Sequence, residues 1–185
     1  MPLRNSAEAY GSLSKFLHWA IVLLIIPQYF LAEAAGELPE GDPQIAQLYG
    51  VHKSIGLLVL ILAVVRVVWK LANSPNPVLT DQVVWRRRTA AASHGLLYLL
   101  IFLQPLTGWA MSSAGGREVS LFGWVTFPPL VGENHELHET LEAVHEWLFY
   151  VLLGVAVVHI LAAIYHHAVL KDDTLRRMLP FSRAS

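Results

Sequence analysis

The sequence predicts an all-α protein, a transmembrane four-helix bundle that forms one integral membrane domain over residues 1–185. The first observation behind this prediction is composition: 55% of the residues are hydrophobic, only 15% are charged, and the mean hydropathy is +0.47. A soluble domain of this size could not bury so much apolar surface. The second is that four separate stretches are long enough to cross the bilayer, which takes roughly 20 residues. The third is the segregation of charge described below.

The four stretches cover about residues 14–34, 48–72, 88–112 and 140–169. Only helices and closed barrels satisfy their backbone hydrogen bonds inside lipid. A barrel needs short strands of alternating polarity, whereas these apolar stretches are continuous, so we expect helices. The turn-forming run Asn73-Ser74-Pro75-Asn76-Pro77 predicts the end of the second helix.

Charge segregation predicts the orientation. The basic residues flank the start of the first stretch, the connection between the second and third, and the end of the fourth: Arg4, Lys15, Lys70, Arg86, Arg87, Arg88, Lys171, Arg176, Arg177 and Arg183. The other two connections carry mainly acidic residues: Glu33, Glu37, Glu40, Asp42, Glu118, Glu133, Glu136 and Glu139. Loops rich in Lys and Arg stay in the cytoplasm, so we expect both termini to be cytoplasmic.

The first stretch has an alternative interpretation as a cleaved signal peptide, because Ala32-Glu33-Ala34 has the small-x-small form of a cleavage site. Cleavage would leave three spans and place the basic tail of the fourth on the wrong side. We therefore favour a retained helix.

Four histidines lie inside the apolar stretches: His18, His52, His145 and His159. Ionisable groups are costly inside a membrane and usually mark a function, and imidazole is a ligand of haem iron. His145 and His159 are fourteen residues apart, so on one helix they share a face at levels about 21 Å apart. Matching the histidines by depth pairs His52 with His145 and His18 with His159. Each pair is suited to hold one haem iron.

Two other roles remain open for these histidines. A single membrane histidine is more often an interhelical hydrogen-bond donor, and chains of His and Glu can relay protons. The pairing by depth favours ligation over both. The chain has no cysteine, which removes disulfides, iron–sulfur clusters and covalent haem attachment from consideration.

Two cations accompany the histidines. Lys53 adjoins His52, and Arg66 lies on nearly the same face of the second helix. Haem propionates are anions that Lys and Arg bind well, and we expect Arg66 to contact one. The alternative is that both side chains extend to the nearest membrane surface.

The remaining histidines carry weaker signals. We expect His166 and His167 at the cytoplasmic interface, near a propionate or a quinone head group, or as a solvated helix end. His94 opens the third span and favours a structural role near the inner haem. His135 and His138 have metal-like spacing, but their acidic surroundings predict that they are solvated.

The ordered set of motifs in this chain resembles the bacterial cytochrome b-561 family of small di-haem membrane proteins. The motifs are Leu17-His18-Trp19, His52-Lys53-Ser54-Ile55-Gly56, Arg66-Val67-Val68-Trp69-Lys70, Pro105-Leu106-Thr107-Gly108-Trp109, His145-Glu146, His159, His166-His167 and Lys171-Asp172-Asp173-Thr174-Leu175-Arg176-Arg177-Met178-Leu179-Pro180. The resemblance implies a multi-pass protein of the bacterial inner membrane with two b haems, ligated by His18, His52, His145 and His159. One branch of the family oxidises superoxide and reduces ubiquinone.

We therefore expect an oxidoreductase that takes electrons from superoxide at the periplasmic face and reduces ubiquinone, with Lys53 as the catalytic residue that attracts the anion. A second hypothesis is a haem b subunit that transfers electrons for a periplasmic donor protein or a dehydrogenase, which the acidic outer loops favour. A third is a haem-free proton or ion transporter. Lipid, quinone, and superoxide or a donor protein are the expected partners; nucleic acid is not.

Overall fold

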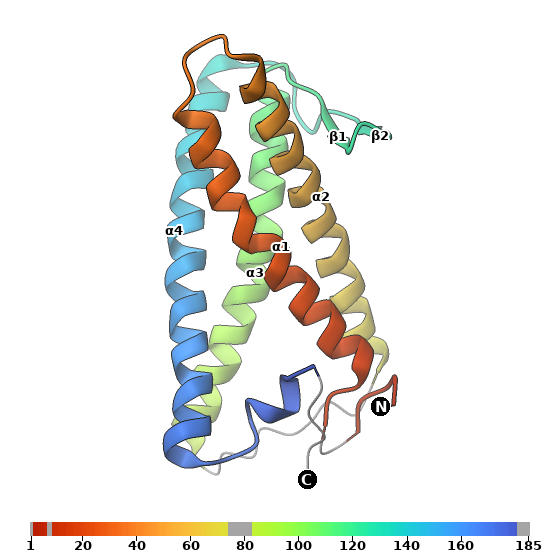
Figure 1. Cartoon of the computed structure of the whole chain (residues 1–185), viewed down its shortest axis with the longest axis vertical. Helices are drawn as coiled ribbons and strands as arrows, with labels where there is room; N and C mark the ends of the chain where they lie inside the picture. The colour runs from red at the N-terminus through yellow and green to blue at the C-terminus, as the bar shows by residue number, and fades with distance from the viewer. Residues whose placement is uncertain (1, 7–8, 74–82, 181–185) are drawn as a thin grey trace.

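A computed structural model of the chain describes residues 2–6, 9–73 and 83–180. It contains four long helices, α1 (Ser12–Gly36), α2 (Pro43–Ala72), α3 (Val84–Ala114) and α4 (His135–Tyr165), which run along one axis (Figure 1). All four are long and apolar enough to cross a membrane. The predicted all-α, four-helix membrane architecture is confirmed. The predicted turn at 73–77 lies, except for Asn73, outside the described residues.

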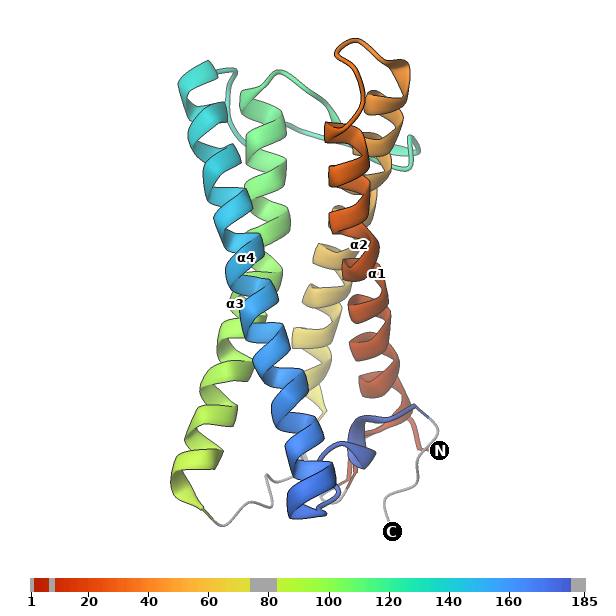
Figure 2. The ribbon, with the colours of Figure 1, turned by 60° about the vertical axis from the view of Figure 1, so that its left-hand side comes forward.

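The bundle is made of two helical hairpins. α1 packs against α2 and α3 against α4, and contacts between α2 and α3 join the two halves, whereas α1 and α4 barely meet. The described segments nearest the two chain ends, 2–6 and 176–180, lie at one end of the bundle, which we call the terminus end (Figures 1 and 2). The opposite end, which carries a small β-hairpin, is the hairpin end. The described residues of the basic regions predicted to be cytoplasmic border the terminus end.

Polar caps extend two of the helices beyond their apolar residues. The Asp42 side chain accepts the Gln44 N–H at 2.8 Å, with Pro43 in the first turn of α2. The Asn134 side chain accepts the Leu137 N–H at 2.9 Å and starts α4. For this reason α2 and α4 begin several residues before the apolar stretches that predicted them.

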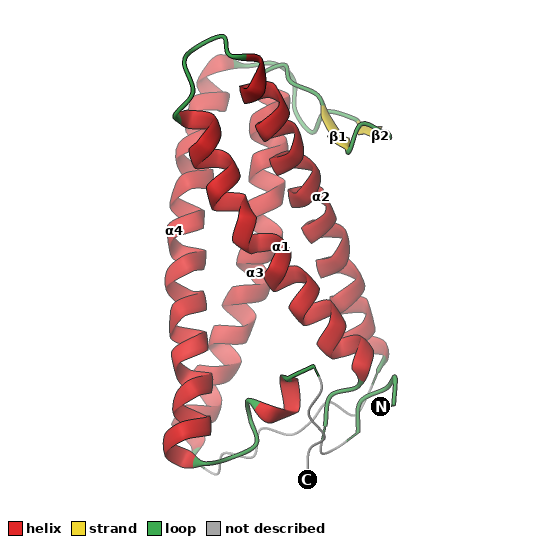
Figure 3. Ribbon diagram, viewed as in Figure 1, coloured by secondary structure: helices red, strands yellow, loops and turns green. Residues whose placement is uncertain are grey.

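The α3–α4 connection and the segment after α4 contain regular structure (Figure 3). Strands β1 (Val119–Leu121) and β2 (Val125–Phe127) form an antiparallel hairpin between α3 and α4. After α4, a π-helical turn (His166–Leu170) ends at Lys171, whose φ is +55°. A 3₁₀ turn (Arg176–Met178) then lies beneath the bundle, where the Trp19 indole N–H donates to the Met178 carbonyl at 2.8 Å.

The interior of the bundle is small and its surface is apolar. Leu17, Ile21, Leu57 and Leu100 are nearly fully buried, but many large apolar side chains along all four helices are exposed. Phe30, for example, is 64% exposed. An apolar exterior of this extent is what a protein surrounded by lipid presents.

Candidate functional site

The four histidines predicted from the apolar stretches meet as two pairs, one toward each end of the bundle. At the hairpin end, the ring centres of His52 on α2 and His145 on α4 are 6.3 Å apart. At the terminus end, those of His18 on α1 and His159 on α4 are 6.5 Å apart. These are the pairs that matching by depth predicts. Each pair connects α4 to the α1–α2 hairpin, so both sites lie between the two halves of the bundle.

The orientation of His52 is fixed by main-chain hydrogen bonds to α1. Its Nδ1 lies 3.1 Å from the Gln28 carbonyl oxygen, which can only accept, so Nδ1 carries the proton and Nε2 keeps its lone pair. The Gln28 side chain returns a hydrogen bond to the His52 carbonyl at 3.2 Å. A ligating histidine ordinarily donates its second N–H to such a partner.

His145 is held by a side chain of α3. Its Nδ1 lies 3.1 Å from Thr107 Oγ1, whose own hydroxyl is 2.9 Å from the carbonyl oxygens of Leu103 and Gln104. Because that hydroxyl proton is used within α3, the oxygen is free to accept from Nδ1–H. This arrangement leaves the lone pair on Nε2, which faces the Gln104 amide nitrogen at 3.2 Å. Gly108 makes room for the ring, since a Cβ there would come within 3.0 Å of it.

Aromatic contacts and one cation characterise the terminus-end pair. The ring centres of His18 and Trp19 are 5.5 Å apart, and those of His94 on α3 and His159 are 5.3 Å apart. His94 therefore belongs to this site, as a third imidazole. The charge of Arg66 acts on all three histidines.

Arg66 points toward the bundle rather than extending to the membrane surface. Its Nη1 donates to the Ser14 carbonyl at 2.9 Å, and its Nε donates to the Tyr98 hydroxyl at 3.1 Å. These bonds place a guanidinium beside the terminus-end pair.

Lys53 lies beside the hairpin-end pair and is half-buried. Its ammonium donates to the Glu118 carbonyl at 2.6 Å, immediately before the β-hairpin. Arg117 is close enough to interact electrostatically with it. Lys53 and Arg117 therefore form a pair of cations in an otherwise acidic end of the molecule.

His166 and Asp172 form a short side-chain contact just after α4. Nδ1 of His166 donates to Asp172 Oδ2 at 2.6 Å. Partial burial raises the pKa of Asp172, but hydrogen bonds from Thr174 and His166 outweigh it and hold that pKa below its ordinary value. His167, its neighbour, is exposed.

The two histidines in the first turn of α4 form no metal site among the described residues. His135 is exposed and lies 3.3 Å from Glu139, whereas His138 is half-buried and donates from Nδ1 to the Met111 carbonyl at 2.9 Å. The prediction that both are solvated is thus wrong for His138, because its ring packs on the end of α3. Within the described ranges, no group of three His, Cys, Asp or Glu side chains could hold a metal ion.

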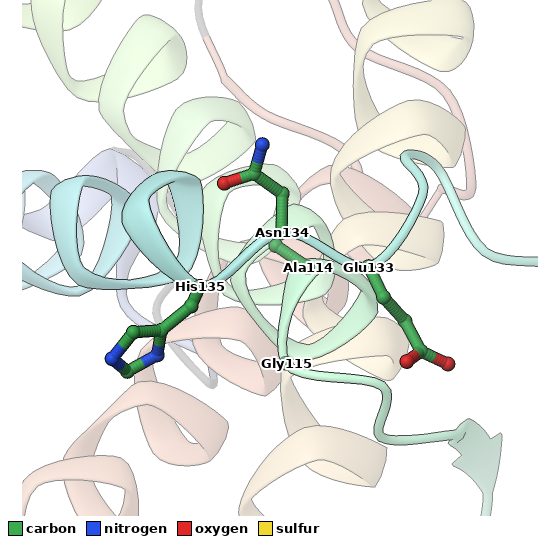
Figure 4. Close-up of a pocket in the computed structure, with 5 residues that line it drawn as sticks. All are labelled: Ala114, Gly115, Glu133, Asn134 and His135. Atoms are coloured by element: carbon green, nitrogen blue, oxygen red, sulfur yellow. The ribbon is translucent and has the colours of Figure 1, made fainter.

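A surface hollow at the hairpin end does not assemble a site either. It is lined by Ala114, Gly115, Glu133, Asn134 and His135. The three polar side chains point away from one another (Figure 4), and Asn134 is engaged as the cap of α4. This hollow is a junction between helix ends.

The paired imidazoles fit an iron porphyrin held through two axial bonds. A metal–imidazole bond of about 2 Å on each side, plus the distance from ring nitrogen to ring centre, separates the two centres by about 6 Å. Both observed separations match this distance. At the hairpin end, the hydrogen bonds made by Nδ1 of His52 and His145 leave the lone pair of each Nε2 available to bind iron. In addition, the buried Oε1 atoms of Gln28 and Gln104 have no hydrogen-bond partner among the described residues.

Fold and site together define a multi-pass membrane haem protein. The chain belongs to the prokaryotic cytochrome b561 family, whose model matches residues 9–181. This family consists of b-type haem proteins of electron transport, which sets the haem-free transporter hypothesis aside.

Relatives of the chain match nearly end to end. The chain is 32% identical over 179 residues to cytochrome b561 homolog 2 of Escherichia coli (strain K12), covering 97% of this chain and 95% of that protein. It is 31% identical over 176 residues to the probable superoxide oxidase CybB of Yersinia pestis, covering 95% and 98%. It is 30% identical over 175 residues to cytochrome b562 of Cereibacter sphaeroides, covering 92% and 94%.

Sequence reasoning missed the residues that orient the histidines. Thr107 is part of the motif Pro105-Leu106-Thr107-Gly108-Trp109, but the sequence alone predicted no role for it. Gln28 and Gln104 are uncharged polar residues inside apolar spans, and that cost is a signal that could have singled them out. The contact of Asp172 with His166 could not be predicted from the sequence, because it depends on the turn of the chain after α4.

Proposed function

We propose that this chain is a di-haem quinone-linked oxidoreductase of the bacterial inner membrane that oxidises superoxide at its hairpin end, which faces the periplasm. The observation that carries the proposal is the presence of two imidazole pairs, at 6.3 and 6.5 Å, toward opposite ends of the bundle. A relative that matches along nearly its full length and is named a probable superoxide oxidase supports the choice of substrate.

In this proposal, His52 and His145 would hold one b haem, and His18 and His159 would hold the other. Each haem would supply reversible one-electron chemistry, which suits electron transfer. Gln28 and Thr107 hold the hairpin-end imidazoles in the tautomer that presents Nε2. Arg66 is the partner for a propionate at the terminus end.

Lys53 and Arg117 guide superoxide to the hairpin end. The surrounding loops are acidic, so attraction of an anion has to be local. Lys53 is next to His52 in the chain, and Arg117 is close enough to Lys53 to interact with it electrostatically. Tethering of the Lys53 ammonium to the Glu118 carbonyl fixes its position. Superoxide gives up one electron there and leaves as dioxygen.

The terminus end is the proposed quinone site. Two superoxide ions supply two electrons, and reduction of one ubiquinone to the quinol also consumes two protons. Groups able to carry a proton gather at this end: His94 beside His159, and the hydrogen-bonded pair His166–Asp172. Cytoplasmic water is the source that reprotonates them.

The decisive experiment measures stoichiometry. Haem-loaded protein in lipid nanodiscs with ubiquinone is exposed to a steady superoxide source, and quinol and dioxygen are quantified. We expect one quinol and two dioxygen per two superoxide consumed. We expect Lys53→Gln to slow the reaction at low superoxide, and Lys53→Arg to retain it. Quinone reduction that proceeds equally well without superoxide contradicts the proposal.

Electron transfer from a periplasmic protein is the second candidate. The observation that favours it is the exposed acidic surface of the hairpin end: Glu37, Glu40, Glu133, Glu136 and Glu139. A basic donor protein would bind such a surface, and its rate of haem reduction would fall steeply with salt. A superoxide reaction of normal stoichiometry in the isolated chain decides against this candidate.

A further inference from the structure

The loop between α3 and α4 contains an unusually apolar segment. Residues 119–132 include no charged residue, although Arg117, Glu118 and Glu133 flank them directly. Fourteen residues are too few to cross a bilayer, which needs roughly 20 in a helix. The segment therefore has the composition of a lipid contact without the length of a span.

The tip of the β-hairpin is bulky, apolar and uncovered. Phe122 is 46% exposed, Trp124 is 84% exposed and Val125 is 54% exposed. Figure 1 shows the hairpin projecting sideways past α2 instead of continuing along the bundle axis. For a bundle that crosses a membrane, lipid lies in that direction.

The backbone at the tip is unfavourable for the residue it carries. Phe122 has φ +51° and Gly123 φ +74°, in a turn closed by the Trp124 N–H to the Leu121 carbonyl at 3.0 Å. Positive φ is uncommon for a bulky side chain and costs on the order of 1–3 kcal/mol. Glycine or asparagine would suit this position better. The structure thus places a half-exposed phenylalanine where glycine or asparagine would be less strained.

Hydrogen bonds to α2 set the level of the hairpin. Ser54 is 2% exposed, its hydroxyl lies 2.9 Å from the Ser120 carbonyl oxygen, and it accepts the Phe122 N–H at 2.9 Å. Its neighbour Lys53 holds the Glu118 carbonyl. Lys53 is the last charged residue before the apolar run 54–65 of α2, so the hairpin is attached where hydrocarbon gives way to head groups.

We propose that the β1–β2 hairpin is an interfacial membrane anchor whose tip, Phe122, Trp124 and Val125, inserts among the lipid head groups at the hairpin end. Tryptophan and other aromatic side chains concentrate at this depth. The paired strands satisfy backbone groups that lipid would leave unpaired, and the following Pro128 and Pro129 have no N–H to satisfy. Because the carbonyl of Glu118, the residue that precedes β1, accepts a hydrogen bond from Lys53, anchoring of the hairpin in lipid would help to fix this edge of the site.

The absence of cysteine makes the test direct. A spin label on Val125→Cys is placed in the full, haem-loaded chain in phosphatidylcholine nanodiscs, and its collisions with dioxygen and with a water-soluble nickel chelate are compared. Glu40→Cys, on the exposed α1–α2 loop, is the water reference, and Leu153→Cys, exposed in the middle of α4, is the hydrocarbon reference.

We expect the ratio of dioxygen to nickel collisions at Val125 to be several-fold above that at Glu40 and below that at Leu153. A ratio equal to that at Glu40 overturns the proposal. Shielding from both reagents also overturns it, because that result means protein covers the tip.

A second pair of variants tests the aromatic side chains themselves. In the Val125→Cys background, the double substitution Phe122→Ser and Trp124→Ser is expected to shift the collision ratio toward the water reference. Leu130→Ser, at an apolar position of the same loop that is 45% exposed, is the matched control and should leave the ratio unchanged. An equal shift in both variants overturns the role of the tip. The haem spectrum of each sample shows that the bundle is folded.

Discussion

The two ends of the bundle hold similar imidazole pairs by different means. At the hairpin end, His52 and His145 donate to a main-chain carbonyl and to a hydroxyl tied into its own helix. At the terminus end, the imidazole rings of His18 and His159 have no hydrogen-bond partner within residues 2–6, 9–73 and 83–180. Aromatic rings and the charge of Arg66 lie beside them instead. The difference teaches that one site is defined by directional bonds and the other by packing and charge.

The largest expected effect comes from removing one ligand at each end. His52→Ala should lose the hairpin-end haem and keep the other, and His18→Ala should do the reverse, because each pair belongs to one site only. Haem-to-protein ratios and reduced spectra measure this: about one equivalent is expected in each variant. The control is His135→Ala, at an exposed histidine in the first turn of α4, which should retain both equivalents. Loss of both haems in either variant shows that the ends are not independent.

The next effect tests the directional bonds of the hairpin end. Thr107→Val removes the acceptor for His145 Nδ1–H while keeping the side-chain shape, and we expect haem affinity at that end to fall about 10–100-fold. Thr107→Ser keeps the hydroxyl and should behave like the parent. Haem loss during competition with apomyoglobin measures the change. If the valine and serine variants lose haem equally, Thr107 acts through packing alone.

A smaller effect is expected from the charge at the terminus end. Arg66→Gln removes a cation that favours the reduced state, so the midpoint potential of the terminus-end haem should fall. For a partly buried group the charge interaction is on the order of 1 kcal/mol, and a tenfold change in a one-electron equilibrium is about 59 mV. Spectroelectrochemistry should thus show a decrease of tens of millivolts.

The matched control for this potential is Arg87→Gln, at an exposed arginine of α3 at the same end. It should leave both midpoint potentials within error. An equal decrease in the two variants shows that general surface charge, rather than the position of Arg66, sets the potential.

The smallest effect concerns the segment after α4. The pKa of Asp172 is lowered in the folded protein, so the His166–Asp172 pair stabilises docking of residues 171–180 at neutral pH. That contribution is lost as pH falls through the lowered pKa, below the ordinary value of 3.8. Hydrogen exchange should show Asp172→Asn opening this segment more easily, by less than about 1 kcal/mol. Asp173→Asn, which affects only a longer contact to Arg176 at 3.7 Å, should change less.

Much of this architecture was accessible from the sequence because hydrocarbon imposes simple rules. Four long apolar stretches predicted four spanning helices, and fourteen-residue spacing on one helix predicted that His145 and His159 belong to different sites. The helix starts at Pro43 and His135 were not predicted, since polar caps carry helices past their apolar stretches.

The residues that surround the histidines were harder to predict from the sequence. Thr107 reaches His145 only because α3 and α4 are adjacent, and His94 reaches His159 for the same reason. A sequence gives depth along each helix but not which helices are neighbours. The placement of Lys53 against the Glu118 carbonyl likewise required the fold of the hairpin loop.

The division of the bundle into two helical hairpins has a consequence for how the protein is made. With haem bound as proposed, each group bridges α4 and the α1–α2 hairpin, across the boundary where direct helix contact is least extensive. In a newly inserted chain, the α1–α2 and α3–α4 pairs would associate only weakly until haem binds between them. Supply of haem would control the lifetime of the polypeptide, since membrane proteases attack helices that have not yet joined.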